Sequence, residues 1–331
     1  MKNIISNIVR GKTLNCLVIV FAALAVVQSA CAALPDASEA VDGILDLQGG
    51  TYTVSGDNAI ANYSGLEFRN GTITFSGAVN QDLSSGFAGF TVGEGAVVTG
   101  GTSSASWYFS ADNFNIAVTN GGKFCVAKDL TLGRQGGTST LLLDGANFEV
   151  TGEFGLPICE NTSSANNNRD YRCDVTITNS TLTLKDKTHV GYILSGVKNT
   201  IKSIESNVRV YDSTITAETW QTASGNDKGS VTDANAHMST YFGHGTIIDV
   251  SKFYINRYRR PNASITFDGA IVRRHGTETG LFDQYQYNSA NRYVTTGKGL
   301  TLDFNDDYTE GSSYAAGISG DGDVINRISL F

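Results

Sequence analysis

The chain has 331 residues, a formal net charge of −8 and 40% hydrophobic residues, which is enough apolar material for a large core. This acidic balance disfavours nucleic acid as a partner, because DNA and RNA binding depends on Lys and Arg contacts with phosphates. The 37 glycines against 3 prolines suit a fold with many tight corners.

The start of the chain has the pattern of a secretory signal peptide. Three basic residues within the first twelve precede an uncharged apolar run over 14–27 and then the small residues Ala30-Cys31-Ala32. The apolar run is too short to cross a membrane, which takes about 20 residues. We therefore expect cleavage after residue 32 and export to the cell surface or the extracellular space. Removal of residues 1–32 takes away three positive charges and no negative ones, so the formal charge moves from −8 to −11.

Cys31 allows a second interpretation, in which the signal is that of a lipoprotein. Such signals usually carry Leu three positions before the lipidated cysteine, and this chain has Gln28 there. Membrane contact is expected only through such a lipid anchor or through a C-terminal segment beyond this sequence.

Three cysteines remain after cleavage, Cys125, Cys159 and Cys173. Cys159 and Cys173 bracket a polar stretch, 160–172, which we expect to protrude as a loop. In an oxidising compartment these two cysteines could close the loop with a disulfide, and the alternative is three unpaired thiols.

Residues 33–44 are expected to form an N-terminal cap. They contain a short predicted helix with Asp36 or Ser38 at its N-cap.

Repeated segments follow over 45–331, the predicted repeat domain. Each copy has two apolar residues, a corner of Gly, Asn, Asp or Ser, and then further apolar residues. The copies start at Leu45, Leu66, Phe90, Ile116, Leu141, Val175, Val208 and Ile265. Their starts are 21, 24, 26, 25, 34, 33 and 57 residues apart. The gaps near 34 are expected to hold outward loops, and the last gap a degenerate copy near 248–255. Periods of 20–50 residues indicate a stacked array.

The copy from Val175 to Leu184 shows the pattern best. Apolar residues alternate with threonines, as in a strand with one dry face, and Asn179-Ser180 interrupt the alternation. A unit this short cannot bury its own apolar face, so we predict that copies stack along one axis. Antiparallel hairpins in a sandwich or barrel are the alternative. Their type I′ turns require positive φ at both central residues, and Asn179-Ser180 fits that requirement poorly. One left-handed residue suffices for a solenoid corner.

The segments LEFRNGTITF, VTITNSTLTL and VRVYDSTITA resemble the right-handed parallel β-helix proteins, which include bacterial autotransporter passengers and the pectate-lyase-like superfold. The resemblance implies an all-β, single-stranded right-handed parallel β-helix with an N-terminal cap and protruding loops. It also implies a secreted or cell-surface, adhesin-like protein. The glycine-rich segment from Gly317 to Val324 is similar to repeats of those passengers. No stretch remains for a membrane barrel, so the chain is expected to be released, held at the surface in some other way, or truncated.

The resemblance raises the question of polysaccharide cleavage, but the ordered polygalacturonase-like pattern is missing. Gly243-His244-Gly245 matches one element, whereas Asp306-Asp307 comes after the histidine, and Arg327-Ile328 is followed by Ser329 where that pattern has Lys. We therefore predict no catalytic residues, since the fold class alone does not establish an activity.

One basic and aromatic cluster stands out in the acidic chain. Arginine forks suit uronate carboxylates and tyrosine faces suit sugar rings, so we name this cluster as the candidate ligand-binding site. The alternative is an outer strand with solvated charges. The cluster comprises Tyr254, Arg257, Tyr258, Arg259, Arg260, Arg273 and Arg274.

No metal site is predicted. Asp303, Asn305 and Asp307 alternate like the first calcium ligands of an EF-hand, but Tyr308 and Tyr314 stand where that loop needs Gly and Glu. A looser calcium site stays open, no other cofactor is expected, and the four histidines show no ligand spacing.

Paired threonines raise an ice-binding ladder as a further hypothesis. They recur at two outward positions in several copies, but the intervening copies are expected to place Ala96/Val98 and Asn147/Glu149 there. We interpret the threonines as residues with ordinary strand propensity on a solvent-exposed face. The pairs are Thr51/Thr53, Thr72/Thr74, Thr181/Thr183 and Thr214/Thr216.

The sequence thus favours a structural or adhesive β-helix without a catalytic site, whose outer loops meet a glycan or another cell surface. The alternative is a lyase or hydrolase acting on acidic polysaccharides. An enzyme requires acidic and basic side chains from successive turns to converge in one groove, whereas a stalk or adhesin leaves them scattered.

Overall fold

The computed structural model describes residues 35–82, 84–159, 169–193, 201–225, 235–255, 262–275, 282–283, 292–296, 301–303, 318–319 and 325–327. The expected signal peptide, with Cys31, lies outside these ranges, as do 160–168, Asp306 and Asp307. Within them, no helix is long and apolar enough to cross a membrane.

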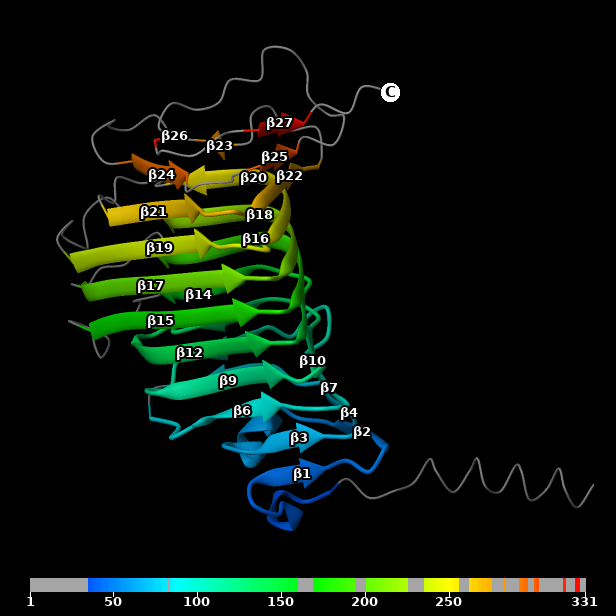
Figure 1. Cartoon of the computed structure of the whole chain (residues 1–331). Coiled ribbons are helices and arrows are strands. Elements are labelled where there is room, and N and C mark those ends of the chain that lie inside the picture. Colours follow the sequence, from blue (N-terminus) through cyan, green and yellow to red (C-terminus); the bar gives the residue numbers. More distant parts are fainter. Residues whose placement is uncertain are drawn as a thin grey trace, which may run out of the picture.

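One face of the molecule is a parallel sheet of eleven strands, sheet A, whose order follows the chain (Figure 1). Each strand of sheet A pairs with the strand of the next turn of the stack. We call one such turn a coil, so each coil contains one strand of sheet A. The strands are β1 (Ile44–Asp46), β3 (Glu67–Arg69), β6 (Gly89–Val92), β9 (Phe114–Thr119), β12 (Gly137–Asp144), β15 (Arg169–Thr178), β17 (Ile201–Tyr211), β19 (Ala236–Phe242), β21 (Asn262–Phe267), β24 (Arg292–Thr296) and β26 (Ile318–Ser319).

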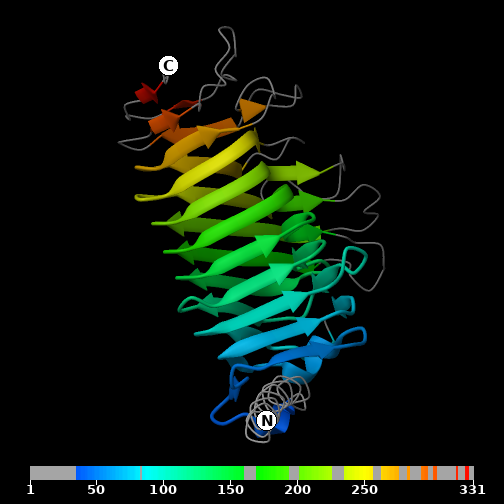
Figure 2. The same ribbon diagram turned by 90° about the vertical axis from the view of Figure 1, so that its right-hand side faces the viewer.

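A second parallel sheet, sheet B, runs behind sheet A, as the view in Figure 2 shows. Its main row contains β2 (Thr51–Val54), β4 (Gly71–Phe75), β7 (Ala96–Gly100), β10 (Lys123–Val126), β13 (Asn147–Val150), β16 (Thr181–Ile193), β18 (Thr214–Gly225), β20 (Ile247–Ile255), β22 (Ile271–Arg274), β25 (Thr301–Asp303) and β27 (Ile325–Arg327). A shorter row, which we call the third face, consists of β5 (Val79–Gln81), β8 (Trp107–Phe109), β11 (Leu130–Leu132), β14 (Phe154–Cys159) and β23 (Phe282–Asp283). The long strands β16, β18 and β20 continue from the main row into the third face.

Every pairing between named strands in the described ranges is parallel, which makes the hairpin alternative wrong. The chain is all-β, and its long parallel sheets are consistent with the expected parallel β-solenoid. The predicted alignment also holds residue by residue, since Phe90, Ile116, Leu141, Val175 and Val208 stack directly on one another. Leu45 is the exception, because it stacks on Phe68 and not on Leu66.

The long gap before Ile265 contains one further coil, formed by β19 and β20, as expected, but its copy starts at Thr240 and not near 248–255, which lies in β20 of sheet B. Its core position holds Thr240, stacked between Val208 and Ile265. This polar residue is 1% exposed, and its Oγ1 accepts a hydrogen bond from Trp220 Nε1 at 3.2 Å. A threonine at an apolar position explains why this copy breaks the sequence pattern.

The corners after β15 and β17 rest on single left-handed residues, as predicted, whereas the corners after β1 and β9 use two in succession, Gln48-Gly49 and Asn120-Gly121. Asn179 has φ 50° and Asp212 has φ 47°. The serine after each residue is buried and joins neighbouring coils, because Ser180 Oγ accepts the Ala146 amide and Ser213 Oγ accepts the Ser180 amide, both at 3.0 Å. The corner sequences therefore both turn the chain and fix the spacing of the coils.

The main core of the interior is a continuous apolar stack. It is rich in aromatic rings in the early coils, where Phe124 lies 5.3 Å from Phe90 and 5.7 Å from Phe148 between ring centroids. A second, smaller core is formed by Cys159, Tyr171, Ile201, Ile204, Ala223, Ala236, Met238 and Ala263.

Two short 3₁₀ helices, η1 (Ala37–Glu39) and η2 (Ala59–Tyr63), accompany the first coils. Asp36 caps η1, since its carboxylate accepts the Ser38 amide at 2.8 Å, and Glu39 completes a capping box. This confirms Asp36 as the N-cap. The predicted loop 160–172 is wrong at its end, because β15 already begins at Arg169 and pairs with β12 and β17.

Candidate binding surfaces

The structure places the described members of the basic and aromatic cluster on two different faces. Tyr254 lies in the part of β20 that belongs to the third face, in register with Gln221. Arg273 and Arg274 lie in β22 of sheet B. Arg257, Tyr258, Arg259 and Arg260 lie outside the described residues, so the common ligand site stays a prediction.

The two arginines of β22 differ in environment. Arg273 is in register with Asp249 of β20, on the outer side of sheet B. Arg274 stacks on the core residue Val250, is 3% exposed, and has a buried Nε without a hydrogen-bond partner. Its burial separates it from the outer surface, where a polysaccharide would lie.

On sheet B, next to these arginines, a histidine lies between two carboxylates. His275 Nδ1 lies 2.6 Å from Asp249 Oδ1, and its Nε2 lies 3.7 Å from Glu218 Oε2. Ser251 Oγ lies 3.2 Å from Glu218 Oε1, but it donates at 2.6 Å to the Glu218 carbonyl. The group brings together side chains from three successive coils.

A second acid and histidine pair lies on the third face. Glu153 Oε1 is 2.9 Å from Lys187 Nζ, and Glu153 Oε2 is 3.8 Å from Nε2 of the buried His189. The His189 ring and the Lys187 ammonium lower the pKa of Glu153 to about 2, against the opposing effect of its partial burial. A carboxylate held ionised in this way does not serve as a proton donor near neutral pH.

The outer face of sheet A carries a ladder of polar side chains that runs along the stack. In the early coils Thr140 Oγ1 lies 2.7 Å from Asn115 Oδ1. In the later coils the Asn207 amide donates to Asp174 at 3.0 Å, and Ser239 donates to Asn207 at 3.0 Å. These residues occupy the same register position in successive strands.

Aromatic and ionic groups flank this ladder. Tyr211 and Tyr241 have ring centroids 5.6 Å apart, and both side chains are half-buried. The Tyr241 hydroxyl donates to Asp268 at 2.6 Å, and this bond raises the pKa of Tyr241 to about 12. Arg172 bridges Asp174 at 2.7 Å and Glu205 at 3.3 Å. The sequence interpretation missed this surface, although aligning the polar positions of the copies would have revealed it.

The threonine ladder on sheet B is broken, by one of the two expected pairs of residues but not by the other. Val97 and Thr99, not Ala96 and Val98, are in register with Thr72 and Thr74. Asn147 and Glu149 stand where they were predicted, in register with Thr181 and Thr183.

Cys159 and Cys173 are both buried, and the disulfide between them stays a prediction. Burial raises the pKa of Cys173 to about 12, which makes it a poor nucleophile. Within the described ranges, no group of three or more His, Cys, Asp or Glu side chains is arranged to hold a metal ion.

The histidine of the Gly243-His244-Gly245 segment lies at an exposed corner, where Gly245 has φ 74°. It is a corner residue between β19 and β20. A pocket of about 530 Å³ lies elsewhere, beside β1 at the N-terminal end of the described chain.

Comparison with protein-family models, curated proteins and solved structures finds no match to this chain.

Proposed function

We propose that the protein is an exported structural or adhesive solenoid without a catalytic site, and that the outer face of sheet A contacts a glycan or another cell surface. The observation that carries this proposal is the ladder from Asp174 through Asn207 to Ser239. It presents hydrogen-bonding groups at one register position in successive coils. Strands in a sheet are about 4.8 Å apart, so an extended polar polymer could lie along several coils.

Tyr211 and Tyr241 would provide the apolar contacts of this surface. Their rings lie near the corner end of the strands that carry the ladder, and sugar rings have apolar faces that pack on tyrosine. Arg209 is exposed on the same side, in register with Tyr241, and could pair with a uronate carboxylate.

The scattering of titratable groups supports a binding role over catalysis. Glu153 and His189 lie on the third face, whereas Asp249 and His275 lie on sheet B several coils further along. Each acid contacts its own histidine, and the two groups lie on different faces in the described part of the chain. Polysaccharide cleavage by a general acid and base requires two such groups on either side of one bond.

The proposal includes a right-handed winding and an N-terminal cap over 33–44. Parallel strands joined by crossover connections are right-handed in about 98% of known cases. The cap is supported by Ala37 and Ala40, which pack against the main core.

A binding assay tests the proposed function. The purified exported chain is applied to immobilised polygalacturonate, alginate and a neutral glucan, and the double variant Tyr211→Ala/Tyr241→Ala is compared with Thr216→Ala on the outer face of sheet B. We expect binding to at least one polymer, about tenfold weaker in the tyrosine variant, or roughly 1.4 kcal/mol. If both variants bound the polymer equally well, the outer face of sheet A would not be the binding surface.

The enzyme alternative is tested with the same polymers. Folded protein is incubated for days with calcium present, and reducing ends and unsaturated products are measured. Product above the level of a heat-denatured control would overturn the non-catalytic assignment.

A further inference from the structure

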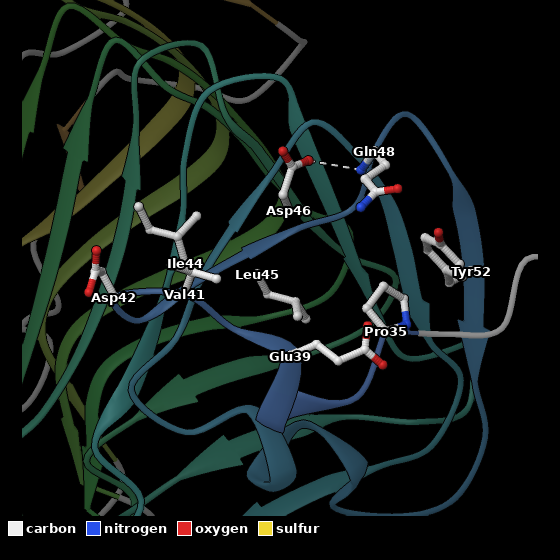
Figure 3. A pocket seen from close by; sticks show the side chains of 9 residues that line it. All are labelled: Pro35, Glu39, Val41, Asp42, Ile44, Leu45, Asp46, Gln48 and Tyr52. Carbon is white, nitrogen blue, oxygen red and sulfur yellow. Dashed lines mark hydrogen bonds between the residues drawn. The ribbon is translucent and has the colours of Figure 1, made fainter.

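The outer face of sheet A has a distinctive balance of hydrogen-bond donors and acceptors over β15, β17 and β19. These strands carry the ladder of Asp174, Asn207 and Ser239 at one register position. The pocket beside β1, drawn in Figure 3, belongs to the first coil, and four strands of sheet A separate β1 from β15. The pocket therefore takes no part in this surface.

The side-chain donors of the ladder are engaged within the face itself. The Asn207 amide nitrogen donates at 3.0 Å to Asp174 Oδ1 and at 3.0 Å to Glu205 Oε1, which uses both of its N–H groups. Ser239 Oγ donates its one hydrogen to Asn207 Oδ1 at 3.0 Å. The ladder residues therefore have no side-chain hydrogen left for a ligand, and only their lone pairs remain.

Arg172 completes this set of bonds. Its Nε donates at 2.7 Å to Asp174 Oδ2, and its Nη1 lies 3.3 Å from Glu205 Oε2. Partial burial by itself would raise the pKa of Asp174, but the hydrogen bonds from Arg172 and Asn207 outweigh it, so the pKa lies below its ordinary value of 3.8. Asp174 is therefore ionised at neutral pH and only accepts hydrogen bonds. A ligand on the ladder has to donate.

The cations of this face are largely engaged by its carboxylates. Arg172 contacts two of them, and Lys202 Nζ lies 2.6 Å from Asp170 Oδ2. Arg209 is exposed, but its charge acts on Asp174 and contributes to the lowered pKa of that carboxyl group. A polymer with a carboxylate on every sugar would find these cations engaged, and like charges brought together at an interface weaken binding.

Tyr211 and Tyr241 form an aromatic platform beside the ladder. A Cβ atom added at Gly243 would lie 2.6 Å from Tyr211 Cδ1 and 2.7 Å from Tyr241 Cε1, so both rings occupy space that a side chain at Gly243 would fill. The Tyr241 hydroxyl donates to Asp268 at 2.6 Å, which holds that ring in place and engages its hydrogen as well. The platform therefore offers preformed apolar contacts.

We propose that the ligand of this surface is a neutral, hydroxyl-rich glycan, whose hydroxyl groups donate to the ladder and whose sugar rings pack on the aromatic platform. The inference rests on the proposed function and names the class of glycan. Each hydroxyl group can donate one hydrogen, and uncharged sugar rings have apolar faces that pack on tyrosine. A uronate polymer, with Arg209 as its contact, is the competing ligand.

The test compares polymers with and without their charge. The processed full-length protein is titrated with polygalacturonate, with alginate, with both polymers after chemical reduction of their carboxyl groups, and with a neutral glucan. We expect a neutral polymer to bind about tenfold more tightly than its charged counterpart. Its affinity should change less than about twofold between low and high salt, because it carries no charge that salt could screen.

Two variants test the contacts on the protein. Asp174→Asn keeps the shape of the side chain but replaces an acceptor oxygen with a donor amide, and Gly243→Ala displaces the rings of the platform. We expect each variant to bind the neutral polymer about tenfold more weakly, or roughly 1.4 kcal/mol. Glu94→Gln, at an exposed corner of another coil, is the matched control and should bind like wild type. Thermal unfolding verifies that each variant is folded.

Three results would overturn the proposal. Equal or tighter binding of the charged polymers would identify uronates as the ligand and would leave the binding role of the face intact. If Asp174→Asn bound a neutral polymer as well as wild type or better, the ladder would not accept hydrogen bonds from the ligand. Binding of none of the polymers would contradict the proposed function itself.

Discussion

Two stretches of the stack share one backbone plan but have different interiors. Residues 63–154, the aromatic region, fill the core with packed rings, including Phe68, Phe90, Trp107 and Phe124. Residues 169–217, the aliphatic region, have a main core of Val, Ile, Leu and Ala side chains such as Val175, Leu182 and Val210.

The aliphatic region has additional contacts outside its core. Its sheet A strands are longer, with 10 residues in β15 and 11 in β17 against 3 in β3. Ion pairs join neighbouring coils, for example Lys185 with Glu149 and Lys202 with Asp170. Smaller core side chains bury less apolar area per coil, and longer strands with outer contacts offset that difference. The comparison indicates that the stack requires left-handed corners and a filled interior, but not one kind of interior.

The strongest test of this comparison removes one core side chain from each region. Phe124→Ala is expected to lower the free energy of unfolding by about 3–5 kcal/mol, because it deletes a ring that contacts three others. Val210→Ala is expected to lower it by about 1.5–3 kcal/mol. Urea denaturation and amide hydrogen exchange of the affected coils measure both, and the outer residue Leu142, changed to Ala, is the control. A larger loss for Val210→Ala would contradict the comparison.

The buried threonine of the coil that follows the aliphatic region offers a second test. Thr240→Val keeps the volume but leaves the Trp220 indole N–H without its acceptor, and Thr222 Oγ1 loses a neighbour at 3.3 Å. We expect a loss of about 1–3 kcal/mol in the same denaturation assay. Thr176→Val, on the outer face of sheet A, is the matched control and should have little effect. If both variants were equally stable, the buried bond would not support this coil.

Corner geometry is expected to matter equally in both regions. Asn179 has φ 50°, which a β-branched residue adopts poorly, so Asn179→Val should cost about 1–2 kcal/mol. Asn179→Gly has no such strain and should come close to wild type. Thermal unfolding of the pair isolates the effect of φ, and a valine variant as stable as the glycine variant would show that the corner can rearrange.

The ionic contacts between coils predict a pH dependence. The pKa of Glu153 in the folded protein is about 2, below its ordinary value of 4.5. Its contribution to stability is therefore fully present above pH 4.5 and is lost as pH falls from about 4.5 toward 2. We expect the thermal midpoint of Glu153→Gln to vary less over this interval than that of wild type. Parallel curves for the two proteins would exclude Glu153 as a source of the acid sensitivity.

The smallest expected effect is that of a single exposed ion pair. Lys185 Nζ lies 2.5 Å from Glu149 Oε1 with 53% of the lysine side chain exposed, so Lys185→Ala should cost about 0.2–1 kcal/mol, and less at high salt. A double-mutant cycle with Glu149→Ala measures the pair directly. A coupling well above 1 kcal/mol would mean that outer ion pairs are the main support of the aliphatic region.

The sequence alone predicted the architecture because its determinants are local and repeated. Alternating apolar residues, such as Val175 and Ile177, specify which face of a strand is dry, and the residue at each corner must tolerate a left-handed backbone. Both signals recur in each copy, so aligning the copies predicted which residues stack on one another from Phe90 to Val208. The Asp36 cap was predictable for the same reason, since its partners lie within three residues.

Only the tertiary structure decided which side chains of different coils meet. Contacts such as Asp174 with Asn207, or Trp220 with Thr240, depend on loop lengths and strand register, which shift by one or two residues without a visible change in pattern. Arg273 and Arg274 show this most clearly, because adjacent residues of a strand point to opposite faces and only the stack shows that Arg274 lies inside. The pocket at the N-terminal end arises likewise, from three short segments that the fold brings together.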